Sequence, residues 1–181
     1  TGRVETQGNA QNISAARDQG ALANIAFSAG SNISNLGNIY SDGAITFRSN
    51  SANITNGGNI TGINDIVFQA DNGSVTNSGS ARSNSLALFQ GQNFNNSGDF
   101  VANANLLISA PNIANTGLIG SGGSLTLAAS GNITNSGTIF AVNNLALSAG
   151  SQFHNDEGLT LALGNISITA PMVINDSARI E

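Results

Sequence analysis

An asparagine recurs along the chain at a nearly constant interval, and this regularity limits the possible folds more than any other feature. Copies of the phrase "GNITNSGTIF" align on it, and the steps between successive asparagines are 21, 21, 19, 19, 20, 20 and 20 residues. These residues are Asn35, Asn56, Asn77, Asn96, Asn115, Asn135, Asn155 and Asn175. So steady a period predicts a solenoid, in which each repeat contributes one coil.

Apolar residues hold fixed places relative to this asparagine. Two positions before it lie Ile33, Ile54, Val75, Phe94, Ile113, Ile133, Phe153 and Val173, and four positions after it lie Ile39, Ile60, Ala81, Phe100, Ile119, Ile139 and Leu159. An alternating pair follows: Ile45/Phe47, Ile66/Phe68, Leu86/Leu88, Leu106/Ile108, Leu125/Leu127, Leu145/Leu147 and Ile166/Ile168. A spacing of two between apolar residues is typical of strands, whose successive side chains point to opposite faces.

A parallel β-helix satisfies all of these columns together, and we expect an all-β chain with about 20 residues per coil and roughly eight to nine coils. Crossovers between parallel strands favour right-handed coiling. The repeats fill residues 1–181, so we expect a single β-helical segment. A leucine-rich-repeat horseshoe would need more leucine and a helical segment in each repeat. Disorder, which the Gly, Ser and Asn content suggests, is disfavoured by the regular placement of the 40% apolar residues.

The repeated asparagines predict a ladder along the rod. Stacked at about 4.8 Å, each side-chain amide could donate to one neighbour and accept from the other; the alternative is an outward turn residue. Gly follows two positions later in six of the eight copies, as at Gly137, where it would permit a bend. The copy at 155–157 lacks this Gly and is the expected site of distortion. In the last copy Ser177 replaces Gly, and Arg179 falls where an aliphatic residue is expected.

The composition excludes several classes of function. The chain has no Lys, only 8% charged residues and a net charge of −5, whereas nucleic-acid binding needs a basic surface. No apolar run approaches the roughly 20 residues of a membrane-spanning helix. We therefore expect no nucleic-acid partner and no membrane span.

Two stretches, "NITNSGTIFAVNNLALSAG" (132–150) and "NIANTGLIGSGGSLTLAAS" (112–130), resemble the haemagglutinin repeats of filamentous haemagglutinins. The same repeats occur in the related contact-dependent growth-inhibition exoproteins. The resemblance covers nearly the whole chain from about residue 18. It implies a right-handed parallel β-helix within a very large, secreted, rod-like surface protein of a Gram-negative bacterium.

The resemblance also implies partners and a location. A dedicated outer-membrane transporter would export the full-length protein by two-partner secretion, and the rod would meet a receptor or glycan on a host or neighbouring cell. We expect the protein to be secreted or held at the bacterial cell surface. The chain shows no obvious secretion domain or toxin-like region, which favours a fragment of a larger protein. Its lack of Cys fits export of an unfolded chain through a pore.

A carbohydrate-active β-helix, such as a polysaccharide lyase, a hydrolase or a tailspike-like fragment, is the alternative function. Such enzymes need carboxylates that converge on one face. Asp42 and Asp65 could stack near Arg48, and Asp156 and Glu157 lie beside His154, the only histidine. The other acids scatter in the repeat register. We therefore expect no catalytic site, no metal site and no cofactor.

The residues between the paired apolar positions should point outward. They are Ala26, Thr46, Val67, Ala87, Leu107, Thr126, Ala146 and Ser167, and all are uncharged. Such residues suit a plain solvated sheet. The alternative is a flat surface that contacts carbohydrate, a receptor or a neighbouring rod, for which Thr46, Val67, Leu107 and Thr126 are the candidate residues.

Overall fold

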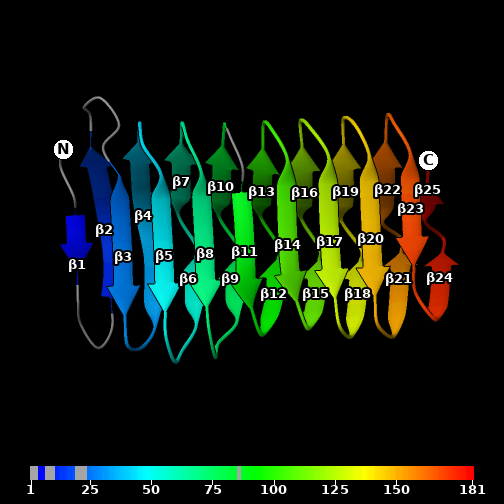
Figure 1. Cartoon of the computed structure of the whole chain (residues 1–181), viewed down its shortest axis with the longest axis horizontal. Helices are drawn as coiled ribbons and strands as arrows, with labels where there is room; N and C mark the ends of the chain where they lie inside the picture. Colours follow the sequence, from blue (N-terminus) through cyan, green and yellow to red (C-terminus); the bar gives the residue numbers. More distant parts are fainter. Residues whose placement is uncertain (1–3, 7–10, 19–23, 85–86) are drawn as a thin grey trace.

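The computed structural model describes residues 4–6, 11–18, 24–84 and 87–181, and these residues form strands, turns and bends but no helix. Coils of about 20 residues stack into a β-solenoid of about eight turns. In Figure 1 the front strands run downward and the strands behind them run upward, while the chain advances from left to right. This path is a right-handed coil. The expected fold class, an all-β right-handed parallel β-helix, is confirmed.

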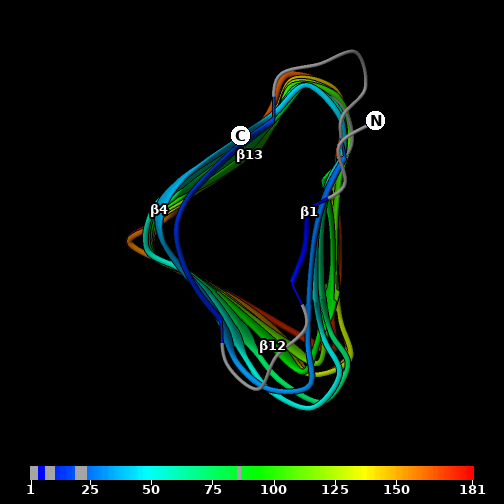
Figure 2. The same ribbon diagram turned by 90° about the vertical axis from the view of Figure 1, so that its left-hand side faces the viewer.

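The solenoid has three faces, which Figure 2 shows as the sides of a triangular cross-section. The first face is a nine-stranded parallel sheet. Its strands are β1 (Val4–Thr6), β3 (Ile25–Ala29), β5 (Ile45–Ser49), β8 (Ile66–Ala70), β11 (Ala87–Gly91), β14 (Leu106–Ala110), β17 (Leu125–Ala129), β20 (Leu145–Ala149) and β23 (Ile166–Thr169).

The second and third faces belong to one 16-stranded sheet, because the long strands β2 (Gln11–Asp18) and β4 (Ile33–Ser41) bend across both. The second face continues with β6 (Ile54–Asn56), β9 (Val75–Asn77), β12 (Asn93–Asn96), β15 (Asn112–Asn115), β18 (Asn132–Asn135), β21 (Gln152–Asp156) and β24 (Met172–Asp176). The third face continues with β7 (Asn59–Gly62), β10 (Ser80–Ser83), β13 (Asp99–Ala102), β16 (Leu118–Ser121), β19 (Thr138–Ala141), β22 (Leu159–Ala162) and β25 (Arg179–Ile180).

The core lies between the three faces and consists of the stacked apolar columns. Inward residues of one coil pair in register with inward residues of the next, as at Ile33 and Ile54. The aromatic rings also stack along the rod: the ring centroids of Phe27 and Phe47 are 5.0 Å apart, and those of Phe47 and Phe68 are 4.9 Å apart. Because each apolar side chain packs against its counterparts in neighbouring coils, stability is shared along the stack.

One predicted apolar pair is out of register by one residue. Ala87 pairs with Ile66 and Leu106, whereas Leu88 pairs with Val67 and Leu107. Position 87 of β11 is therefore aligned with the inward columns of the neighbouring coils, and position 88 with their outward column. Ala87 does not belong to the outward column, and Leu86 lies outside the described residues. The sequence "LALF" offers two alternating patterns, and only the register with neighbouring coils decides between them.

The corner after Asn155 is distorted, as its lack of the usual glycine predicts. Glu157 adopts a φ of 56°, and the chain carries one extra residue there. Thr160 therefore pairs with Ile139 and is buried, so the prediction of Leu159 as the inward residue is wrong.

The final copy repeats this insertion. Ser177 has a φ of 49°, Arg179 pairs with Leu159, and Ile180 pairs with Thr160. Arg179 thus does not replace the inward aliphatic residue, because Ile180 holds that register position. The last copy therefore keeps the repeat pattern, shifted by one residue.

Candidate binding surfaces

The eight asparagines form a continuous hydrogen-bonded ladder at the corner between the second and third faces. Each side-chain Nδ2 donates to Oδ1 of the asparagine in the next coil, at distances of 2.7 to 2.8 Å from Asn35 to Asn175. The ladder is buried up to Asn155, and Asn175 is exposed. All donors point the same way along the rod, so the ladder has a direction.

Most ladder amides also donate to backbone carbonyls at the corner of their own coil and at the corner of the next. The Nδ2 of Asn115 donates to the carbonyl oxygens of Gly117 and Thr138, both at 3.1 Å. The backbone carbonyl of Asn115 accepts from the amides of Ser136 at 2.8 Å and Gly137 at 3.3 Å. Buried polar groups that are fully paired rigidify a fold and specify its register. The ladder is therefore structural: its polar atoms are used within the protein.

The glycines beside the ladder are required by close stacking and not by an unusual backbone. A Cβ at Gly117 would lie 2.2 Å from the carbonyl oxygen of Gly98, and a Cβ at Gly137 would lie 2.2 Å from that of Gly117. Among the described residues, no glycine has a positive φ. Gly137 is therefore not needed to permit an unusual bend. It is needed because only a residue without a side chain lets the corners of neighbouring coils stack this closely.

The outer column of the first face contains the four residues predicted as a binding face. Thr46 pairs with Val67, and Leu107 pairs with Thr126, so these residues lie in one row across β5, β8, β14 and β17. Leu107 is 37% exposed and the other three are half-buried. A shallow depression of about 450 Å³ adjoins this column at the ends of β11, β14 and β17.

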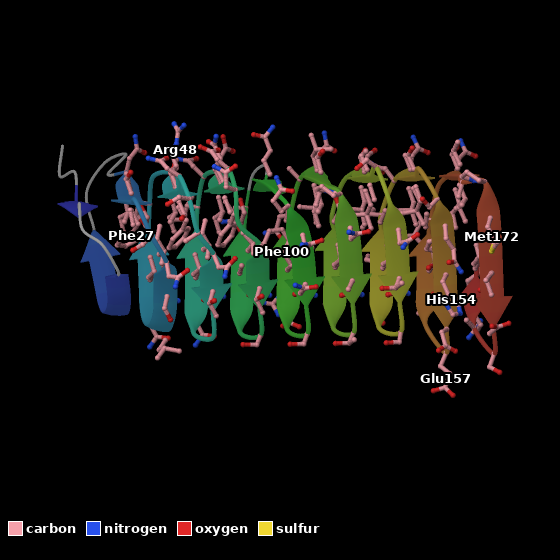
Figure 3. All side chains as sticks on the ribbon, turned by 90° about the horizontal axis from the view of Figure 1, so that it is seen from below. Phe27, Arg48, Phe100, His154, Glu157 and Met172 are labelled. Atoms are coloured by element: carbon pink, nitrogen blue, oxygen red, sulfur yellow. The ribbon has the colours of Figure 1, made fainter. Side chains whose placement is uncertain are left out.

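The acidic residues that the sequence placed near Arg48 lie in different columns of the solenoid. Ser41 pairs with Gly62, so Asp42 lies just beyond that pair, whereas Asp65 directly precedes β8 in a different column. Asp42 accepts a hydrogen bond from the Tyr40 hydroxyl at 2.6 Å. Figure 3 shows Arg48 pointing away from the core, and its Nη2 lies 3.4 Å from a carboxylate oxygen of Asp71. Asp42 and Asp65, which the sequence allowed to stack near Arg48, therefore occupy different columns, and Arg48 pairs with Asp71.

The histidine and the nearby acids lie where the two inserted residues distort the corner. His154 Nε2 is 3.5 Å from a carboxylate oxygen of Asp176, and Asp156 pairs in register with Asp176. Glu157 points away from the rod beside them (Figure 3). A groove of about 260 Å³ runs past His154 and Asp156 toward Thr134. Within the parts of the chain that the structure describes, no three His, Cys, Asp or Glu side chains form a group that could hold a metal ion.

The outside of the third face carries an apolar patch that the sequence analysis did not predict. This third-face patch consists of Val101, Leu118, Phe140, Val142, Leu159, Leu161 and Leu163 on or beside β13, β16, β19 and β22. Leu163 is 70% exposed, Val142 is 37% exposed and the others are half-buried. The available signal was the run of adjacent apolar residues in "TIF" and "LTLAL", because one of two neighbouring strand residues must face outward.

No protein-family model, curated protein or solved structure matches this chain. The described residues include no helix that is long and apolar enough to cross a membrane. The relation to haemagglutinin repeats therefore stays a resemblance carried by the repeated phrases alone.

Proposed function

We propose that this chain is a rod-forming segment of a large secreted adhesin or growth-inhibition exoprotein of a Gram-negative bacterium. The rod presents flat binding surfaces to a receptor or glycan on another cell and has no catalytic activity of its own. An outer-membrane transporter of a two-partner secretion system exports the full-length protein. The alternative function is that of a carbohydrate-active β-helix.

The observation that carries this proposal is the uninterrupted stacking of similar coils. The Asn ladder, the glycine corners and the core columns all serve to hold one coil on the next at about 4.8 Å. The connections between described strands are short turns, as the strand bounds show. A structure of this kind is suited to hold a surface at a fixed distance and orientation, which is a mechanical role.

The outer column of the first face is the surface that we assign to cell attachment. It is flat, uncharged and made of hydroxyl and aliphatic side chains, with Leu107 the most exposed of the four predicted residues. Surfaces without charges can be desolvated at little cost, because no ion has to leave water.

A cell-adhesion assay with beads that carry the purified chain tests this assignment. We expect the beads to bind cells, and we expect Leu107→Asp to lower binding at least about tenfold because a charge in the column resists desolvation. The matched control is Asn95→Asp, at an exposed position of β12 on the second face. Beads that fail to bind any cell or glycan tested, or an equal loss in both variants, would contradict the proposal.

A further inference from the structure

The sequence contains two Asn-Gly dipeptides, and the structure places them in different surroundings. Asn56-Gly57 belongs to the buried ladder, whereas Asn72-Gly73 lies in the exposed turn between β8 and β9. An asparagine that precedes glycine is especially prone to spontaneous loss of its side-chain amide, because glycine has no side chain to hinder attack by its own backbone nitrogen. The surroundings of each pair therefore decide where this chemistry occurs.

The amide of Asn56 is held on every side. Its Nδ2 donates to Oδ1 of Asn77 at 2.7 Å and to the carbonyl oxygen of Ser80 at 3.2 Å, and its Oδ1 accepts from Asn35 at 2.7 Å. The backbone N–H of Gly57, which would supply the nucleophile, donates to the carbonyl oxygen of Asn35 at 2.8 Å. All of these hydrogen bonds oppose a reaction between the two groups, and Asn56 is only 1% exposed to water.

The amide of Asn72 is held by fewer hydrogen bonds. Its Nδ2 donates to the carbonyl oxygen of Asn50 at 2.9 Å, and its side chain makes no other hydrogen bond among the residues that the structure describes. The backbone N–H of Gly73 lies 3.4 Å from the carbonyl oxygen of Ala70, longer than the usual range of about 2.7–3.2 Å. Asn72 is also exposed, so water reaches it.

We propose that Asn72 is a site of spontaneous deamidation, with water as the only co-reactant. The backbone nitrogen of Gly73 loses its proton and attacks Cγ of Asn72. A new C–N bond forms, the bond from Cγ to Nδ2 breaks, and ammonia leaves with the proton. The resulting succinimide then adds water at one of its two carbonyl carbons, and the ring C–N bond at that carbon breaks. Opening at Cγ leaves aspartate, and opening at the backbone carbonyl leaves isoaspartate, whose main chain runs through the former side chain.

Coil stacking requires the glycine of this reactive pair. A Cβ at position 73 would lie 2.0 Å from the carbonyl oxygen of Ala52 in the preceding coil, so only glycine fits. Asn72 in turn fastens the corner to that coil through the carbonyl oxygen of Asn50. The two residues that hold this corner on its neighbour are therefore the two that react.

Deamidation weakens the corner in which it occurs. A carboxylate at position 72 has no proton to donate to the carbonyl oxygen of Asn50, and it adjoins Asp71, which already pairs with Arg48. In the isoaspartate product the backbone gains one carbon atom where it packs against Ala52. The modification goes beyond the proposed attachment role, because it adds a negative charge beside the end of β8 as the protein ages.

Peptide mass mapping of the folded chain, after prolonged incubation at mildly alkaline pH, tests the proposal. Asn72 should convert at least about tenfold faster than Asn56, because more hydrogen bonds must break at Asn56 and each one slows the reaction. Asn103 is the internal control: it is exposed and its Nδ2 donates once, to Oδ1 of Asn84, but alanine follows it. It should stay unmodified. Asn72→Gln should also stay unmodified, because attack on its longer side chain closes a less favourable ring.

Unfolding separates the effect of the structure from that of the local sequence. In guanidinium chloride the two Asn-Gly pairs should convert at rates within about fivefold of each other, because the hydrogen bonds of the ladder are lost. The proposal is overturned if Asn72 in the folded chain reacts no faster than Asn103, or if Asn56 in the folded chain reacts as fast as Asn72.

Hydrogen exchange of the variant Asn72→Asp tests the effect on the corner. The backbone amides of residues 71–74 should exchange at least about twofold faster than in wild type, since the hydrogen bond to Asn50 is lost. The amides of residues 102–105, at a corner of another coil, should exchange as in wild type. Unchanged exchange at residues 71–74 would refute the weakening of the corner.

Discussion

Replacement of one ladder asparagine is the perturbation that the structure describes most completely. In Asn115→Ala, the Oδ1 atom of Asn135 loses its donor, and the carbonyl oxygens of Gly117 and Thr138 each lose one hydrogen bond. Asn96 loses its acceptor at 2.8 Å but can still donate to the carbonyls of Gly98 and Leu118. The main damage is therefore one orphaned acceptor and a small cavity.

The expected cost follows from these two effects. A buried polar atom without a partner costs about 1–3 kcal/mol, and the truncated side chain leaves a cavity in a packed corner. We expect Asn115→Ala to lower the free energy of unfolding by about 3 kcal/mol. Asn175→Ala is the control, because Asn175 ends the ladder: it accepts from Asn155 but donates to no further asparagine, so its loss orphans no amide oxygen, and it is exposed, so water can take its place. We expect that variant to lose less than about 1 kcal/mol.

Urea unfolding followed by circular dichroism measures both values, provided that the transitions have the same slope. The comparison between the two variants removes effects common to any loss of an Asn side chain. If Asn115→Ala were no more destabilising than Asn175→Ala, the buried ladder would not stabilise the coil stack, and its role as the register-defining element would be refuted.

Two further variants and one assay probe other parts of the structure. Gly117→Ala should destabilise the fold by at least about 3 kcal/mol in urea unfolding, because its Cβ would clash with the carbonyl of Gly98. Gly30→Ala, with open space around it, should change the free energy of unfolding little. Equal effects would contradict the stacking role of the glycine. Phe47→Ala should cost about 3–5 kcal/mol, since this ring is buried between Phe27 and Phe68, and a loss below about 1 kcal/mol would argue against the aromatic stack. A polysaccharide panel with product analysis should show no turnover, and turnover that disappears in Asp42→Ala or Asp65→Ala would establish the carbohydrate-active alternative.

The 20-residue period made the fold predictable from the sequence, since the Asn, Gly and apolar columns recur in almost every coil. The local register was harder to predict. Ala87 and Thr160 occupy inward register positions where the spacing favoured Leu88 and Leu159, and in each case pairing with the neighbouring coils decides the outcome. At Thr160 the cause is the residue inserted at the Glu157 corner, which a fixed count from the asparagine cannot take into account.

Surface properties were predicted least well. The alternation of inward and outward residues along each strand predicted the outer column of the first face correctly, except at Ala87. The third-face patch was not predicted, because residues such as Phe140 and Leu161 adjoin inward apolar positions and belong to none of the repeating columns. Only the coil register shows that one row, from Arg82 to Leu161, lies on the outside and runs parallel to the rod.

Distances between spin labels along the first face test the central claim, that the chain forms a rod of regularly stacked coils. The chain has no Cys, so Ser167→Cys can be combined with Thr46→Cys or with Ala26→Cys and labelled without background. Positions 46 and 167 are six strand spacings apart, and positions 26 and 167 are seven apart. Double electron–electron resonance should give backbone separations of about 29 Å and 34 Å, an increase of one strand spacing. Equal distances, or a spread without a defined maximum, would contradict the stacked rod.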